Sequence, residues 1–376
     1  METSDLSVIE LNGTPRERGR HYGQFASSQI AKIVKLWRAE LGSYSADSAC
    51  KKSINPDAYL HEFLSQTNHL AALTQWVPEL LEELKGIAEG ADQPFENICG
   101  LQLLDEEWMF GMSRNLSQSA DKCTAFAVSN QANNISYAGQ NMDVGSWVDN
   151  KQVLLRVMPR GGAPEALIFS IAGNTGLNGL NAQGLGVTCN TLAQLNYSSD
   201  GLPVGAIVRC ILSMQTIDEA EQFLRLVPHA SGQNYILSSG GDMRCFECSA
   251  NRVVRYQPES GDERIFHTNH PLVNDDLNDF LAPQKKRNAN TVARLNSICT
   301  RLGDTAKTFT LEDIKAALAA HDNPKHPVSR NTNNEGSPIG YTAGSSIYEL
   351  GDTPRLHLAA GPPCETAFEI FDFKTL

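Results

Sequence analysis

The spacing of apolar residues changes once along the chain, and this change limits the folds that the chain can adopt. Between Thr14 and Phe110 apolar residues recur at steps of three and four, as they do from Ile30 to Leu41, which is typical of amphipathic helices. After the polar stretch 111–122, short segments rich in β-branched and apolar residues predict strands. Strands that come in blocks between helices favour an α+β fold, with helices packed on sheets, over a βαβ winding.

The expected elements follow from these patterns. Helices are predicted around residues 30–41, at 77–90, where Pro78 occupies a first-turn position, and at 95–108. The second part should contain strands at 124–129, 136–141, 152–158, 165–171, 235–239, 243–249, 252–257, 345–350 and 367–373. Its helices should cover 203–215, 218–227, 284–301 and 311–319.

The charge of the chain excludes some classes of function. The 31 Lys and Arg residues against 43 Asp and Glu give a net charge of -12, which repels nucleic acid and provides no basic surface for phosphates. Apolar runs stay below the roughly 18 residues that cross a bilayer, and two acidic residues stand where a secretory signal has a basic start. We therefore expect a cytoplasmic protein that binds neither nucleic acid nor a membrane.

The nine cysteines are an odd number without regular spacing, which argues against a disulfide framework. Cys245 and Cys248, followed by His267 and His270, imitate the spacing of zinc ligands. In the strand predicted at 243–249, however, Cys245 and Cys248 would point to opposite faces of the sheet. A metal would need a bulge there, so no metal site is expected.

Cys123 stands where the polar stretch ends and the first predicted strand begins. Taken alone, a cysteine is more often a buried packing residue than a nucleophile. Cys123-Thr124 is accompanied, however, by segments in a fixed order at residues 13–19, 76–90, 139–143, 179–187 with Asn190, 267–270, 329–330 and 361–364. In this order they resemble the acyl-coenzyme A:isopenicillin N acyltransferase family, a branch of the N-terminal nucleophile (Ntn) hydrolases that forms peptidase family C45.

In that family the precursor cuts its own chain before a cysteine, and the resemblance places this cut between Lys122 and Cys123. It implies a four-layer αββα Ntn-hydrolase sandwich built from a mainly helical segment 1–122 and a nucleophile-bearing segment 123–376, held together as a heterodimer. The α-amine at a new terminus has an ordinary pKa of about 7.7–8 and can accept a proton near pH 7. One residue would then supply both the nucleophilic sulfur and the base.

The resemblance also assigns roles to four other residues. Asn269 matches the family's oxyanion asparagine, and Asn190 is a second candidate donor. Asp143 matches an aspartate that would orient the new terminal amine, and Arg330 matches an arginine whose planar fork could anchor Asp143 or a substrate carboxylate. Without the resemblance, these side chains could equally serve turns, caps or the protein surface.

Two features depart from the family pattern. Lys122 stands where members commonly have glycine, whose conformational freedom eases the strained geometry of a backbone N-to-S acyl shift. Asp143 lies two residues farther from the cysteine than expected, a difference that a turn near 131–134 can absorb. An uncut chain would lack the free amine and need another base, so a Cys–His pair with His267 or His270 remains the alternative mechanism.

The sequence thus favours a self-processing cysteine amidohydrolase or acyltransferase that acts on a small N-acyl or aminoacyl conjugate through a thioester on Cys123. The alternatives are an uncut Cys–His amidase and a processing-incompetent relative that binds a ligand without catalysis. Residues 173–176 lack the lysine and the following helix of a phosphate-binding loop. Coenzyme A is therefore not expected as the acyl donor, and no cofactor is expected.

Overall fold

The computed structural model describes residues 6–43, 54–114, 123–129, 135–158, 160–259, 261, 263–279, 288–331 and 340–374. Lys122 and the turn predicted at 131–134 lie outside these ranges. The first part contains β1 (Ser7–Leu11), α1 (Pro15–Phe25), α2 (Ser27–Ser43), α3 (Pro56–Gln66), α4 (His69–Trp76), α5 (Pro78–Ala91), α6 (Phe95–Gln102) and α7 (Leu104–Ser113).

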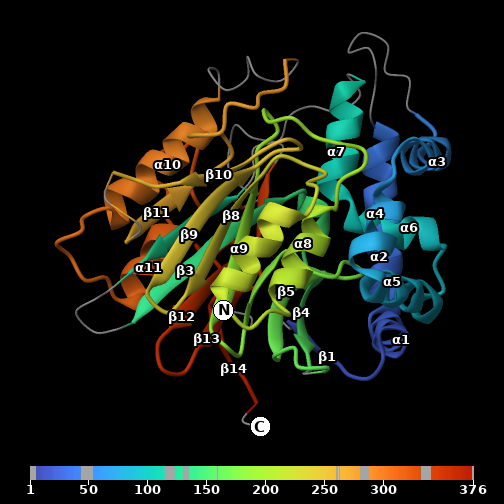
Figure 1. The fold of residues 1–376 in the computed structure, drawn as a ribbon, viewed down its shortest axis with the longest axis horizontal. Helices are drawn as coiled ribbons and strands as arrows, with labels where there is room; N and C mark the ends of the chain where they lie inside the picture. Colours follow the sequence, from blue (N-terminus) through green and yellow to red (C-terminus); the bar gives the residue numbers. More distant parts are fainter. Residues whose placement is uncertain are drawn as a thin grey trace.

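The second part carries most of the strands (Figure 1). Its strands are β2 (Thr124–Val128), β3 (Ser136–Val144), β4 (Gln152–Val157), β5 (Ala166–Ile171), β6 (Asn178–Asn181), β7 (Leu185–Thr191), β8 (Gln233–Ser239), β9 (Asp242–Cys248), β10 (Val253–Tyr256), β11 (Arg264–His267), β12 (Tyr341–Leu350), β13 (Arg355–Ala359) and β14 (Glu369–Asp372). Its helices are the 3-10 helix η1 (Ser146–Val148), α8 (Val204–Ile211), α9 (Ile217–Leu226), α10 (Ala289–Leu302) and α11 (Leu311–Leu318).

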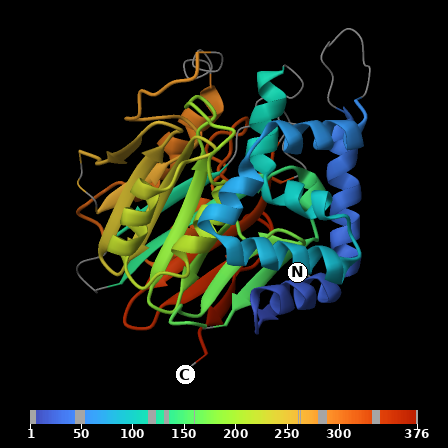
Figure 2. The ribbon, with the colours of Figure 1, turned by 45° about the vertical axis from the view of Figure 1, so that its right-hand side comes forward.

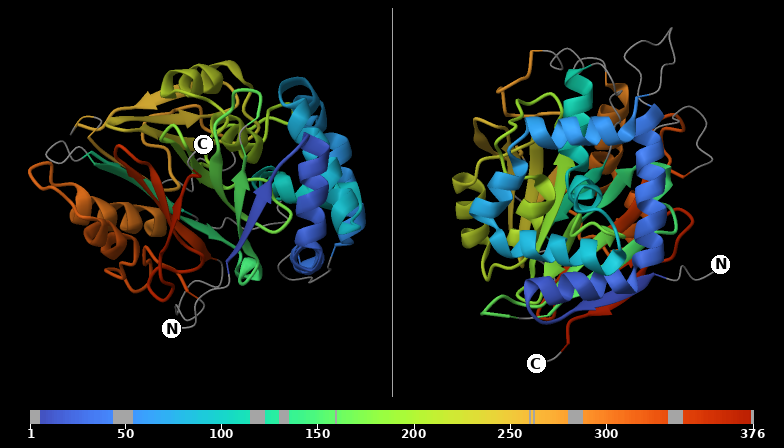
Figure 3. Two further views of the ribbon diagram at one scale, coloured as in Figure 1. Left: turned by 90° about the horizontal axis from the view of Figure 1, so that it is seen from below. Right: turned by 90° about the vertical axis from the view of Figure 1, so that its right-hand side faces the viewer.

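Two sheets stack face to face between helices. One has the strand order β1-β4-β5-β6-β7-β8-β9-β10 and the other β11-β2-β3-β12-β13-β14. Helices α8 and α9 contact the first sheet, whereas α10 and α11 contact the second, and the two sheets contact each other through β2, β3 and β7 (Figure 3, left). This order of layers confirms the predicted α+β fold with an αββα sandwich.

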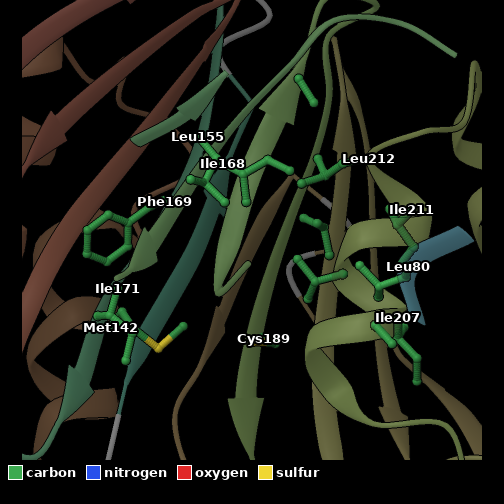
Figure 4. Packing of buried hydrophobic residues seen from close by; sticks show 14 of the residues in the cluster. Leu80, Met142, Leu155, Ile168, Phe169, Ile171, Cys189, Ile207, Ile211 and Leu212 are labelled. Atoms are coloured by element: carbon green, nitrogen blue, oxygen red, sulfur yellow. The ribbon is translucent and has the colours of Figure 1, made fainter. Parts of the chain in front are cut away.

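The alternation of side chains along a strand explains how the layers are held. On β5, Phe169 and Ile168 point to opposite sides (Figure 4). Phe169 packs on Gly344 of β12 in the other sheet, where an added Cβ would lie 2.4 Å from the ring. Between the second sheet and its helices lies a separate apolar cluster that includes Phe126, Ile298 and Ile314.

The N-terminal helices pack beside the first sheet, near β1 and β4 (Figure 2). Helices α1 and α5 cross so closely that a Cβ added to Gly86 would lie only 2.3 Å from the carbonyl oxygen of Arg16. Next to this crossing the buried Glu83 accepts hydrogen bonds from Arg18, at 2.5 Å, and from Arg209 of α8, at 3.0 Å. The segments 13–19 and 76–90 therefore meet at this helix crossing.

Residues on the two sides of Cys123 are joined through the first sheet. Strand β1 pairs in parallel with β4, with Ser7 opposite Val153. The hydroxyl of Tyr22 donates to the carbonyl oxygens of Ile171 and Asn174, at 3.1 and 3.0 Å. The N-terminal part thus supplies one edge strand of a sheet whose other strands all follow Cys123.

Most predicted elements are confirmed, and contacts with distant parts of the chain explain two of the differences. The helix predicted at 95–108 is broken at Leu103, where the Gln102 side chain bonds to the Gly173 carbonyl and the Thr175 backbone. The strand predicted at 136–141 continues to Val144, because β12 pairs with β3 over the whole length of β3. Residues 111–113 belong to α7 rather than to a linker. Among the described residues, none of the helices has the length and apolar character to cross a membrane.

Candidate active site

Cys123 lies immediately before β2 and is buried. Its Sγ atom lies 3.4 Å from Sδ of Met142 and 3.9 Å from the carbonyl oxygen of Asp143, both on β3. Its backbone has a φ of +46°, in the left-handed region. This conformation costs a non-glycine residue roughly 1–2 kcal/mol. The candidate nucleophile is therefore held in a strained backbone at a strand end.

Cys123 lines a cavity of about 50 Å³ at the ends of β3 and β7. Its walls are mainly apolar and include Leu104, Met142, Val144, Leu177 and Val204. Asp105 and Asp143 are the acidic members of the described lining, which contains no Lys, Arg or His. The described walls therefore suit an uncharged or a cationic group better than an anionic one.

Asp143 is fixed from the side of the second sheet. Its Oδ1 accepts a hydrogen bond from the Thr342 hydroxyl at 2.7 Å, and its Oδ2 lies 3.9 Å from Nη1 of Arg330. A bulge between Thr342 and Gly344 interrupts the pairing of β12 with β3 beside this contact. Burial raises the pKa of Asp143, although Arg330, Arg294 and the Thr342 hydrogen bond act in the opposite direction. The structure thus brings Asp143 and Arg330 together.

Asn269 follows β11 and is connected to Cys123 through one arginine. Its Nδ2 donates to the carbonyl oxygen of Thr191 at 3.0 Å, and its Oδ1 accepts from Nη2 of Arg294 at 3.0 Å. Nη1 of Arg294 donates to the carbonyl oxygen of Cys123 and, at 2.9 Å, to the Thr124 hydroxyl. Arg294 was not among the predicted site residues. The available signal was its four-residue spacing from Ile298, which puts a charge on the buried face of α10.

Asn190 lies on β7, next to Thr191. Its Oδ1 accepts a hydrogen bond from Nδ2 of Asn234 at 2.9 Å. Its own Nδ2 is buried and makes no hydrogen bond within the described part of the chain. Such a buried, unused donor requires an explanation. Neither Asn190 nor Asn269 is among the residues that line the cavity.

His267 is engaged elsewhere. Its Nε2 lies 2.8 Å from a carboxylate oxygen of Glu247, and its Nδ1 lies 2.8 Å from the carbonyl oxygen of Thr268. His270 Nδ1 lies 3.0 Å from the Thr291 hydroxyl. These contacts leave no ring nitrogen of His267 for a pair with Cys123 in this conformation.

The cysteines of the zinc-like spacing lie on β9, as predicted for that strand. The Cys245 thiol donates to Oδ1 of Asn234 at 2.8 Å. Within the ranges that the structure describes, three or more His, Cys, Asp or Glu side chains nowhere gather as a metal site would require.

The family described as acyl-coenzyme A:6-aminopenicillanic acid acyl-transferase matches residues 129–338, more than half of the chain. A relative from Emericella nidulans, the 40 kDa form of acyl-coenzyme A:6-aminopenicillanic-acid-acyltransferase, is 26% identical over 267 residues, which are 71% of this chain and 70% of the relative.

Two solved structures share low sequence identity with the chain. Penicillin V acylase from Agrobacterium tumefaciens is 17% identical, with a TM-score of 0.48, over 68% of this chain and 87% of the acylase. A variant of conjugated bile acid hydrolase from Clostridium perfringens is 12% identical, with a TM-score of 0.45, over 67% of this chain and 97% of the hydrolase.

Proposed function

Because the chain belongs to the acyl-coenzyme A:6-aminopenicillanic acid acyl-transferase family, we propose that it is a self-processing cysteine amidohydrolase or acyltransferase. The substrate is a small N-acyl or aminoacyl conjugate, whose amide is cleaved through a thioester on Cys123. The observation that carries this proposal is the buried Cys123 thiol, which lies at a strand end and lines a mainly apolar cavity together with Asp143.

Maturation is proposed to begin at Cys123 itself. Its sulfur attacks the carbonyl carbon of Lys122, the peptide C–N bond breaks, and the nitrogen of Cys123 leaves as a free amine. Water then hydrolyses the resulting thioester and restores the thiol. The left-handed backbone of Cys123 supports this step, because breaking the bond releases the strain.

After the cut, residues 1–122 and 123–376 are proposed to stay together as a heterodimer. Support comes from β1, which pairs with β4, and from the buried contact of Glu83 with Arg209. Separating the fragments would expose the edge of a sheet and leave a charge unpaired in the core.

In turnover the terminal amine of Cys123 takes the proton of its thiol, and the sulfur attacks the substrate carbonyl. The proton then passes to the leaving amine, and water or a second amine resolves the thioester. Asp143, anchored by Arg330, would orient the terminal amine. Asn269 is the proposed oxyanion donor, and the unused Nδ2 of Asn190 makes it the second.

The second candidate function is ligand binding without processing. It is favoured by Lys122, a bulkier and less flexible residue than the glycine common at this position in the family. Under this alternative the chain stays whole and the cavity binds a small molecule without turnover.

The test combines intact mass with a panel of N-acyl and aminoacyl amines. We expect fragments of residues 1–122 and 123–376, hydrolysis of at least one amide, and loss of both in Cys123→Ala. Cys99→Ala is the matched control, because Cys99 is also buried but does not line the cavity. A whole chain without turnover would favour ligand binding, whereas an uncut chain with turnover that His267→Ala abolishes would establish the Cys–His mechanism.

A further inference from the structure

Arg294 is fully buried on α10, between that helix and the second sheet. A buried guanidinium is tolerated only where acceptors meet its five N–H donors. Nε donates to Oδ1 of Asn290 at 2.7 Å, and Nη1 donates to the hydroxyl of Thr124 at 2.9 Å. These two bonds fix the plane of the guanidinium relative to both α10 and β2.

Two further hydrogen bonds of this side chain reach the two ends of the proposed site. Nη1 donates to the carbonyl oxygen of Cys123, and Nη2 donates at 3.0 Å to Oδ1 of Asn269. Because the guanidinium is planar and rigid, it sets the separation of these two groups. Because Oδ1 of Asn269 is occupied, the amide must direct its Nδ2 donors the other way. One donor goes to Thr191, and the second is left for an oxyanion.

We propose that Arg294 is a positioning residue, which holds Cys123 and Asn269 at a fixed separation and keeps the terminal amine of the cut chain uncharged. The inference rests on the proposed function, since only the cut chain has this amine. It adds to that function a residue that contacts the backbone of the nucleophile.

The charge of Arg294 acts on the amine through space. The carbonyl oxygen and the nitrogen of one residue lie only a few ångströms apart, so the guanidinium lies close to the terminal nitrogen and disfavours its protonation. Among the described residues, the other charged or titratable groups near Cys123 include Asp143 and Arg330 on one side and Asp105 and Cys189 in the cavity wall. Burial raises the pKa of Cys189 well above its usual range, so this thiol stays neutral.

Three variants separate the position of the guanidinium from its charge. Arg294→Lys keeps the charge but loses the fork. Asn290→Asp keeps both Nη contacts and places a carboxylate against Nε, which offsets the charge from the side away from Cys123. The side chain of Asn290 has a second neighbour, because its Nδ2 lies 3.4 Å from Nδ1 of His326. Arg294→Gln removes both fork and charge.

The expected results differ among the variants. Arg294→Lys should lower kcat about tenfold. It should not change the pH at which kcat/KM falls on the acidic side of its pH profile, which is called the acidic limb below. Asn290→Asp should move that limb to higher pH by about one unit, because the amine protonates more readily, with little change in the plateau. Arg294→Gln should do both. Arg301→Gln, which removes an exposed arginine of the same helix, should leave the limb unchanged.

The proposal is overturned if both Arg294 variants keep the wild-type kcat and acidic limb. If neither of them folds, Asn290→Asp decides, and an unchanged limb overturns the proposal. Failure of the proposed function looks different, because the wild-type chain itself would then stay uncut, or would keep its turnover in Cys123→Ala.

Discussion

Glu106, which lies behind the cavity wall on α7, provides a stability test whose size follows from the structure. Its Oε1 accepts hydrogen bonds from the backbone nitrogen of Val204, at 3.1 Å, and from the Ser231 hydroxyl, at 2.7 Å. Its Oε2 is buried and makes no hydrogen bond to any described residue. Burial, followed by the charge of Asp105, raises the pKa of Glu106 from its ordinary value of 4.5 to about 7.

Glu106→Gln keeps the acceptor for Val204 and removes the titration. Below pH 4.5 the carboxyl is protonated in the folded and unfolded wild-type chain, so the two proteins should have similar stability. Between pH 4.5 and 7 only the unfolded wild-type chain loses this proton, and the wild type is destabilised. A pKa difference of about 2.5 units corresponds to about 3 kcal/mol, the advantage expected for Glu106→Gln above pH 7.

Urea denaturation at pH 5 and pH 8, in the Cys123→Ala background so that a single chain unfolds, measures this difference. Glu106→Ala is the contrasting variant, because it removes the acceptor at the start of α8 and should destabilise the protein at both pH values. An advantage of Glu106→Gln that stays the same at the two pH values would refute the reasoning.

Three further predictions concern the helix crossing, the buried ion pair and the oxyanion donor. Gly86→Ala, whose methyl group would lie 2.3 Å from a backbone oxygen of α1, should destabilise the protein by about 2–3 kcal/mol in thermal unfolding. Gly241→Ala, which meets no atom within 4 Å, should change stability by less than about 0.5 kcal/mol, and equal effects would contradict this view of the crossing. Glu83→Gln should cost about 3–5 kcal/mol in urea denaturation, because the buried Arg209 and the partly buried Arg18 both lose their carboxylate. The partly exposed Glu82→Gln should cost less than about 1 kcal/mol. Asn269→Ala should lower kcat about 100-fold with little change in KM, and steady-state kinetics that show only a raised KM would assign Asn269 to substrate binding instead.

The parts of the fold that local patterns determine could be predicted. The helix around Ile30–Leu41 and the helix that begins at Pro78 have one apolar face each, and these faces are buried. Strand β7 was missed because it contains the polar residues Thr188 and Asn190, which interrupt its apolar pattern although both are fully buried. The strand that contains Asp143 was predicted too short because its end depends on pairing with β12, about 200 residues later in the chain.

The candidate site shows the same division between local and distant determinants. Cys123, Asp143, Asn269 and Arg330 were selected from short motifs, and the structure connects them in two groups, Asp143 with Arg330 and Cys123 with Asn269. The second group is joined by Arg294, whose role depends on three acceptors distant in sequence. A helical pattern alone cannot distinguish such an arginine from an ordinary charged residue on a helix surface.

The claim that Cys123 becomes a chain terminus is tested most directly by the chemistry of a free 1,2-aminothiol. A cyanobenzothiazole condenses with a terminal cysteine, which has both a free amine and a thiol, and does not form this product with an internal cysteine. After denaturation of an active sample, we predict one such label, located by mass on the fragment of residues 123–376. An active sample that gives no labelled terminal cysteine would contradict the account.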